Sequence, residues 1–404
     1  MKDKVVLAFS GGLDTSVIVP WLRENYDYDV IAVCINVGQD KELSGLEDRA
    51  KAMGVTKLYI EDVKEEFAKD YLFPMIKSGA VYETRYYLGT SIARPLIAKV
   101  LVDIAQKENA VAICHGCTGK GNDQVRFELA IKSLAPHIKI IAPWRIWDIT
   151  SRDEEIEYLQ KRNLPVPMKK EESYSRDLNL WHLSHEGLDL ENPKNAPNYD
   201  TLLKLGTHPE KAPEVAEIIT ISFEKGQPTH LNDIQLSPAK LVEEVNKLGG
   251  KHGIGLEDIV ENRVVGMKSR GVYETPGGKI LYYAHEMLEH LTLDRETYQY
   301  KQQVALEYAR LIYDGKWFTP LRYALAEFVN STQEFVTGTV TLKLYKGNII
   351  HQGAESIYSL YSEDLASFTT GDLYNHHDAD GFITLFGLPS KVRALMHQKN
   401  EAAK

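Results

Sequence analysis

The first third of the chain alternates short apolar runs with helical patterns. Continuous, β-branched apolar runs are typical of buried parallel strands, and such runs lie at residues 4–9, 30–37, 57–60, 110–115 and 138–142. Apolar residues recur at helical spacing from Ala93 to Ile104, which predicts a helix over residues 91–109 with Ser91 as its N-cap. The alternation predicts an α/β fold with a doubly wound parallel sheet, whose ligands bind beyond the carboxyl ends of the strands.

The pattern changes after residue 144, where a charged helical stretch ends in the connector Leu164-Pro165-Val166-Pro167. Its prolines stiffen the chain, so we place a domain boundary there. Beyond it, strand-like runs at 218–223 and 336–344 and helical patterns over 279–314 predict an α+β region. Residues 389–404 predict a short amphipathic helix that either packs on the protein or contacts another subunit. We therefore expect domains at residues 1–165, 166–380 and 381–404.

The composition narrows the class of protein. The 404 residues are too many for one ordinary core, and 43% hydrophobic with 26% charged residues is typical of a globular protein. No segment approaches the roughly 20 apolar residues of a membrane span, and the first residues lack the apolar core of a secretory signal. Three cysteines are too few for a disulfide framework and fit a reducing compartment. We expect a cytoplasmic protein without membrane contact, and the net charge of −10 argues against a nucleic-acid partner.

A glycine-rich loop, Ser10-Gly11-Gly12-Leu13-Asp14-Thr15-Ser16, follows the first apolar run and opens onto a helical pattern. The glycines let phosphate oxygens approach backbone amides, while the helix N-terminus and three hydroxyls supply donors. Asp14 is the exception, because a carboxylate beside phosphates is favourable mainly when Mg²⁺ or an ordered water lies between them. An ordinary serine- and glycine-rich turn is the alternative, but the full pattern at a strand-to-helix junction favours a phosphate site.

The loop lacks the lysine of a Walker motif and the spacing of a dinucleotide fingerprint. It resembles instead the pyrophosphate loop of the ATP pyrophosphatases, which cleave ATP between the α- and β-phosphates and transfer AMP to a substrate oxygen. This resemblance implies an enzyme that activates its substrate by adenylation.

A second polar loop, residues 116–128, follows the fourth apolar run. Three glycines in six residues indicate a close approach of the backbone to a ligand. Thr118, Asn122, Asp123 and Arg126 present donors, acceptors and both signs of charge, which suits a zwitterionic amino acid. A solvated turn with Lys120 at its crest is the alternative, and the position at the end of a strand favours a site.

Cys114 and Cys117 form a single C-x-x-C pair. One pair supplies half a zinc site and the sequence has no second pair, so structural cysteines are favoured over metal ligands. Thiol chemistry stays open as the second hypothesis, because tRNA-thiolating enzymes combine a similar pyrophosphate loop with reactive cysteines.

A third polar segment, residues 261–277, decides nothing by itself. Together with the two loops, however, and with the strings Y-Y-L-G-T-S-I-A-R-P at residues 86–95 and E-N-P-K-N at residues 191–195, it resembles the argininosuccinate synthase family over nearly the whole chain. This resemblance implies a step of arginine biosynthesis in which ATP, citrulline and aspartate give argininosuccinate, AMP and pyrophosphate through a citrullyl-adenylate. It also implies a homotetramer with the terminal helix at its interfaces, and Mg²⁺ bound with ATP.

The resemblance implies three groups of site residues. The nucleotide group is Ala8, Phe9, Ser10, Gly11, Gly12, Leu13, Asp14, Thr15, Ser16, Ile35 and Gly116. The citrulline group is Tyr86, Ser91, Asn122, Arg126, Ser175, Ser184, Glu261 and Tyr273. Aspartate would bind Thr118, Asn122 and Asp123, so that Asn122 touches both substrates. Asp14, Asn122 and Asp123 would contribute to catalysis, which rests on positioning and charge stabilisation because no residue has the features of a dedicated general base.

Overall fold

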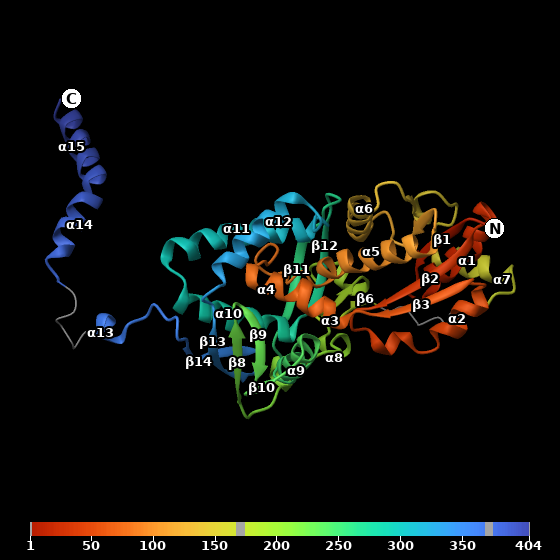
Figure 1. Ribbon diagram of the computed structural model, residues 1–404, viewed down its shortest axis with the longest axis horizontal. Helices are drawn as coiled ribbons and strands as arrows, with labels where there is room; N and C mark the ends of the chain where they lie inside the picture. Colours follow the sequence, from red (N-terminus) through yellow and green to blue (C-terminus); the bar gives the residue numbers. More distant parts are fainter. Residues whose placement is uncertain (1, 167–173, 368–374, 404) are drawn as a thin grey trace. The chain divides into compact units, whose positions relative to one another are not determined.

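A computed structural model describes residues 2–166, 174–367 and 375–403, so Pro167 of the connector and Lys404 of the tail lie outside the described residues. The chain divides into two compact units, Met1–Tyr358 and Ser359–Lys404. The first unit begins with β1 (Lys4–Ala8), α1 (Leu13–Tyr26), β2 (Asp29–Asn36), α2 (Leu46–Met53), β3 (Lys57–Asp62), α3 (Lys64–Glu66), α4 (Phe73–Ser78), α5 (Gly89–Glu108), β4 (Ala112–Cys114), α6 (Asp123–Leu134), β5 (Lys139–Ile141) and α7 (Arg152–Gln160). Figure 1 shows β1, β2 and β3 side by side near the N-terminus.

The first five strands form one sheet in the order β3-β2-β1-β4-β5, and all of its pairs are parallel. This confirms the predicted doubly wound α/β fold. The strand order reverses between β1 and β4, which pair with each other in parallel, with Leu7 opposite Cys114 near their carboxyl ends. The loops that follow β1 and β4 therefore meet at the same edge of the sheet, where such folds bind their ligands.

Alternate residues of the central strands enter two separate cores. Val5 and Leu7 of β1 pack in a cluster with residues of α1 and α2, whereas Val6 belongs to a cluster that contains α5. The apolar runs are continuous because both faces of a parallel sheet are covered by helices. The cluster that contains Val6 and α5 continues into the later part of the unit, through residues such as Ile221 and Leu342, so this core joins the parallel sheet to the antiparallel ones.

The prediction of Ser91 as an N-cap is wrong. Helix α5 begins at Gly89, after Leu88 in a left-handed conformation with φ of 59°, and Ser91 lies buried in the first turn. Tyr86 instead supplies the capping oxygen, because its hydroxyl accepts a hydrogen bond from Thr90 N at 3.1 Å. Ser91 therefore does not cap the helix, and its side chain is buried.

The later part of the first unit forms two antiparallel sheets. One has the order β10-β9-β8-β13-β14 and the other the order β11-β12-β7-β6. Their strands are β6 (Ser175–Leu178), β7 (Leu183–Glu186), β8 (Glu217–Glu224), β9 (Gln227–Leu231), β10 (Ile234–Gln235), β11 (Leu256–Asn262), β12 (Lys268–Glu274), β13 (Gly338–Tyr345) and β14 (Asn348–Glu355). The helices are α8 (Tyr199–Leu202), α9 (Pro238–Lys251), α10 (Pro276–Thr292), α11 (Arg295–Tyr313) and α12 (Pro320–Thr332). This is the predicted α+β region.

The long helical pattern over 279–314 is divided between α10 and α11. The division falls at Asp294, whose side chain caps α11 by accepting a hydrogen bond from Thr297 N at 3.0 Å. An N-cap aspartate favours a new helix start because it satisfies one of the unpaired amides of the first turn.

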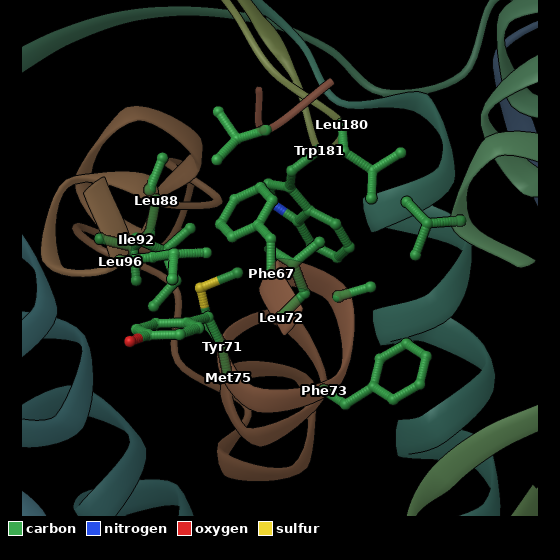
Figure 2. Close-up of a cluster of buried hydrophobic side chains, with 14 of the residues drawn as sticks. Phe67, Tyr71, Leu72, Phe73, Met75, Leu88, Ile92, Leu96, Leu180 and Trp181 are labelled. Carbon is green, nitrogen blue, oxygen red and sulfur yellow. The ribbon is translucent and has the colours of Figure 1, made fainter. Parts of the chain in front are cut away.

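One short segment fixes the later part of the unit to the parallel sheet. Leu180 N donates to Val37 O at 2.7 Å, and Trp181 Nε1 donates to Tyr87 O at 2.8 Å. Figure 2 shows Leu180 and Trp181 in a cluster of apolar side chains with Phe67. The hydrogen bond to Val37 lies directly after the carboxyl end of β2. The segment therefore brings the antiparallel sheet that contains β6 and β7 to the edge of the predicted ligand site.

The second unit contains α13 (Glu363–Ala366), α14 (Asp378–Phe386) and α15 (Leu388–Ala402). Helix α15 corresponds to the predicted terminal helix, and its apolar residues Val392, Leu395 and Met396 are exposed. Among the residues that the structure describes, every helix falls short of the length and apolarity that a bilayer crossing requires.

Candidate functional site

The predicted phosphate loop connects β1 to α1. Gly11 has a φ of 72°, and a Cβ added to it would lie 2.5 Å from Leu46 Cδ1 and 2.9 Å from Arg49 Nε. Glycine is therefore required at this position both by the backbone conformation and by the helix α2 that packs against it. The hydroxyls of Ser10 and Thr15 lie 3.2 Å apart and hold the loop together from inside.

The loop leaves its anion-binding groups available. Gly12 is the exposed N-cap of α1, without a side-chain hydrogen bond to the first turn, and Ser16 Oγ is buried without a hydrogen-bond partner among the described residues. Unpaired amides at a helix N-terminus and a free hydroxyl form an arrangement that binds phosphate oxygens.

The other predicted nucleotide residues surround this loop. Ala8 and Phe9 end β1, Leu13 begins α1, and Ile35 is buried near the carboxyl end of β2. Gly116, which follows β4, lies against the loop, because a Cβ added to it would be 3.2 Å from Ile18 Cδ1 and 3.5 Å from Thr15 Cγ2. The two glycine-rich loops are thus direct neighbours.

Asp14 has an acidic neighbour that the sequence did not indicate. Glu155, on α7, is fully buried and faces the Asp14 carboxylate. Burial, reinforced by the Asp14 carboxylate, raises the pKa of Glu155 to about 8. Glu155 is therefore protonated at neutral pH and adds no charge beside the loop.

The second polar loop leads into α6, where Asn122 is the N-cap and Asp123 the first residue. Arg94 on α5 donates to Asp123 Oδ2 through Nε at 2.9 Å and through Nη2 at 2.8 Å, and Arg126 Nη1 donates to Asp123 Oδ1 at 3.0 Å. Burial alone would raise the pKa of Asp123, but the two guanidiniums outweigh burial and lower it. Asp123 is thus held as a carboxylate between two cations. Thr118 is exposed at the rim of the loop.

Most of the predicted citrulline residues converge beside Asp123. Seven of them are nine-tenths or more buried: Tyr86, Ser91, Asn122, Arg126, Ser184, Glu261 and Tyr273. They come from α5 and the segment that precedes it, from the start of α6, and from strands β7, β11 and β12. Ser175 stands apart, because it is exposed at the start of the edge strand β6.

The polar groups of this buried cluster are paired in a defined way. Ser184 lies opposite Tyr273 in the β7–β12 pairing, and Tyr273 donates its hydroxyl proton to Glu261 Oε1 at 2.7 Å. Burial, followed by the Glu261 carboxylate, raises the pKa of Tyr273 well above its usual value, so the phenol stays a donor. Ser91 is buried beside Tyr86, where burial, the largest cause, raises the pKa of that phenol and the Ser91 hydroxyl lowers it.

Two residues that the sequence analysis missed complete the cluster. Tyr313, the last residue of α11, contacts Asn122, Arg126 and Glu261. Arg94 pairs with Asp123 and also with Asp177 Oδ2 at 2.9 Å. Arg94 stood within the string that resembles a family, but nothing in the local sequence signalled Tyr313, because it is an ordinary tyrosine at the end of an amphipathic helix.

The cysteines do not have the properties of a redox or metal site. Cys114 and Cys117 are free thiols, and burial raises the pKa of both well above the usual value for a thiol. A thiolate is the reactive form of cysteine, so the raised pKa values disfavour thiol chemistry at both positions, of which Cys114 is buried and Cys117 half-buried. Within the described parts of the chain, no three His, Cys, Asp or Glu side chains gather to hold a metal ion.

Comparison with known proteins agrees with this site. The family model of the arginosuccinate synthase N-terminal HUP domain matches residues 4–165, and that of the arginosuccinate synthase C-terminal domain matches residues 174–393. The chain belongs to the argininosuccinate synthase family. The predicted family and the prediction of an ATP-dependent ligase are confirmed.

Named relatives match along their full length. Argininosuccinate synthase of Acetivibrio thermocellus is 63% identical over 400 residues, which cover 99% of each chain. That of Lachnoclostridium phytofermentans is 64% identical over 398 residues, which cover 98% of each chain. A solved U34-tRNA thiolase from Methanococcus maripaludis is 18% identical, covers 41% of this chain and 58% of that chain, and has a TM-score of 0.27. So weak a likeness gives no support to tRNA thiolation, and membership of the argininosuccinate synthase family does not favour it.

Proposed function

We propose that this chain joins citrulline to aspartate at the expense of ATP, releasing argininosuccinate, AMP and pyrophosphate. The observation that carries the proposal is the contact between the two loops at Gly116. It joins an anion-binding loop to a buried cluster that contains hydroxyl, amide, carboxylate and guanidinium groups. A phosphate site beside a site for zwitterionic ligands is what transfer of AMP to an amino acid requires.

The first chemical step takes place between the loops. The ureido oxygen of citrulline attacks the α-phosphorus of ATP, a new P–O bond forms, and the bond to the bridging oxygen breaks with release of pyrophosphate. The loop from Ala8 to Ser16, with Ile35 and Gly116, binds the nucleotide. Asp14, in the first turn of α1, would orient the departing phosphates through a water molecule or an ion.

In the second step the aspartate amine attacks the activated carbon, a C–N bond forms, the bond to the adenylate oxygen breaks, and the amine loses its protons to solvent. Thr118, Asn122 and Asp123 bind aspartate, with the Asp123 carboxylate facing the ammonium group. Citrulline binds the seven predicted residues of the buried cluster together with Ser175. The contribution of Asn122 and Asp123 is positioning and charge stabilisation, which supply several kcal/mol in enzymes of this kind.

The proposal includes the surroundings of the enzyme. Mg²⁺ would enter with ATP and neutralise charge on the phosphates, and Asp14 is the carboxylate of the phosphate loop that would face it. The free thiols fit a cytoplasmic protein, and the exposed apolar residues of α15 fit a homotetramer with this helix at its interfaces. Light scattering should show a tetramer that dissociates when residues 389–404 are removed.

The deciding experiment follows the exchange of labelled pyrophosphate into ATP. Exchange should require citrulline but not aspartate, and net AMP release should require both amino acids. AMP formed without citrulline would exclude the proposal. The variant Asp14→Ala should lose turnover by more than tenfold while its melting temperature is retained, whereas a passive nucleotide-binding protein has no turnover to lose.

A further inference from the structure

Tyr313 lies at the centre of the buried cluster, although it belongs to a helix that contributes none of the proposed substrate contacts. It is fully buried, and it ends α11 where that helix meets α6. The turn that follows fits closely, because a Cβ added to Gly315, whose φ is 77°, would lie 2.6 Å from Arg126 Cα. The end of α11 is therefore locked against the helix that carries the aspartate residues.

The Tyr313 hydroxyl links Asn122, which contacts both amino acids in the proposed function, to Glu261, which contacts citrulline. It accepts a hydrogen bond from Asn122 Nδ2 at 3.0 Å and donates its proton to Glu261 Oε2 at 2.7 Å. Asn122 Oδ1 accepts a hydrogen bond from Val264 N at 2.9 Å, so both ends of the amide are fixed. A hydroxyl that both accepts and donates sets the orientation of its two neighbours at once.

The rest of Tyr313 holds Arg126. Arg126 Nε donates to the Tyr313 carbonyl at 2.9 Å, and the guanidinium carbon lies 4.8 Å from the centre of the Tyr313 ring. The carbonyl is at the C-terminus of α11, where the helix dipole favours a cation. The other face of the ring stacks on Tyr82, with ring centres 3.6 Å apart and planes at 6°.

We propose that Tyr313 is a positioning residue that couples the two amino-acid sites, because one hydroxyl orients Asn122, which contacts both amino acids in the proposed function, and Glu261, which contacts citrulline. This inference rests on the proposed function. It predicts that removal of one oxygen atom weakens the use of both amino acids and leaves the use of ATP unchanged, since the chain of hydrogen bonds does not extend to the phosphate loop.

The test compares Tyr313→Phe with Tyr82→Phe in steady-state kinetics of the full-length enzyme. Tyr313→Phe keeps the ring and the carbonyl and deletes only the coupling hydroxyl. We expect the KM for citrulline to rise about tenfold and that for aspartate several-fold, as for the loss of a hydrogen bond to a charged group, with the KM for ATP within twofold. Tyr82 is the matched control, because its hydroxyl donates to the Asn262 carbonyl at 2.9 Å and takes no part in the hydrogen bonds between Asn122, Tyr313 and Glu261. Tyr82→Phe should leave all three KM values unchanged.

The outcomes separate the inference from simpler explanations. Tyr313→Phe with both amino-acid KM values within twofold of wild type overturns it, and so does an equal rise in the KM for ATP. A double-mutant cycle of Tyr313→Phe with Tyr273→Phe gives a second, independent test. Both hydroxyls donate to Glu261, so their effects on the citrulline KM should be non-additive; additive effects also overturn the inference. Failure of the proposed function would be visible separately, as wild-type enzyme that shows no citrulline-dependent exchange.

Discussion

The phosphate loop and the buried amino-acid cluster are built on different principles. The loop is seven consecutive residues whose geometry is set by backbone angles and a helix terminus, and it keeps groups such as Ser16 Oγ unpaired. The cluster draws side chains from residues 86 to 313 and pairs them with one another at distances near 3 Å. The loop therefore depends on the backbone conformation of one short segment. The cluster depends on the packing of distant elements, so the loss of one side chain should disturb the positions of the others.

The largest effect should come from removing a charge from the cluster. Arg126→Ala leaves Asp123 with one guanidinium fewer and removes the cation that lies on the Tyr313 ring. Breaking a buried ion pair costs roughly 3–5 kcal/mol, so we expect a large fall in the free energy of unfolding and loss of measurable ligation. Chemical denaturation measures the first and AMP release the second. Arg295→Ala is the control, because that arginine is exposed, and a fall of the same size there would remove the distinction.

A smaller effect on stability but a large one on rate should follow a change in the loop. Gly11→Ala places a methyl group where the backbone has a positive φ and where α2 is already in contact. The strain costs about 1–2 kcal/mol, and a displaced loop lowers pyrophosphate exchange by about 100-fold. Gly381→Ala, at a helical glycine with open space around it, should change neither quantity. Unchanged exchange in Gly11→Ala would show that the loop conformation is not what binds the phosphates.

This contrast between a local loop and a cluster of distant residues explains which features could be predicted from the sequence. The parallel sheet and the loop were predictable because continuous apolar runs and paired glycines have local physical causes. Ser91 was misassigned as a cap because the capping oxygen comes from Tyr86, whose ring position depends on tertiary packing. Tyr313 and Glu155 gave no signal, since a tyrosine and a glutamate on helices acquire their roles only through neighbours that are far away in the sequence.

The pH dependence of stability should report on Glu155, which lies beside the phosphate loop. The fold raises the pKa of Glu155 to about 8 from its usual 4.5, through burial and the facing Asp14, with Arg152 acting in the opposite direction. A raised pKa in the folded state means that its stabilising contribution is present below about pH 4.5 and is lost as the pH rises through about 8. The melting temperature of the wild type should fall between pH 6 and pH 9, and that of Glu155→Gln should fall less. Parallel curves for the two proteins would contradict the protonated assignment.

The smallest effect on activity should come from changing Cys117. This residue lies in the loop that follows β4 and belongs neither to the phosphate loop nor to the buried amino-acid cluster. Its half-buried thiol has a raised pKa, which disfavours the thiolate, and its backbone amide, which donates to His115 Nδ1 at 3.3 Å, is unchanged by substitution. Cys117→Ser should therefore retain ligase activity within about twofold, while a thiol reagent at pH 7 should modify the wild type slowly. Loss of activity in Cys117→Ser, together with normal activity in Cys34→Ser, would instead assign the thiol a chemical role. Because the proposed mechanism uses only oxygen and nitrogen nucleophiles, that result would contradict it more directly than any change in the phosphate loop.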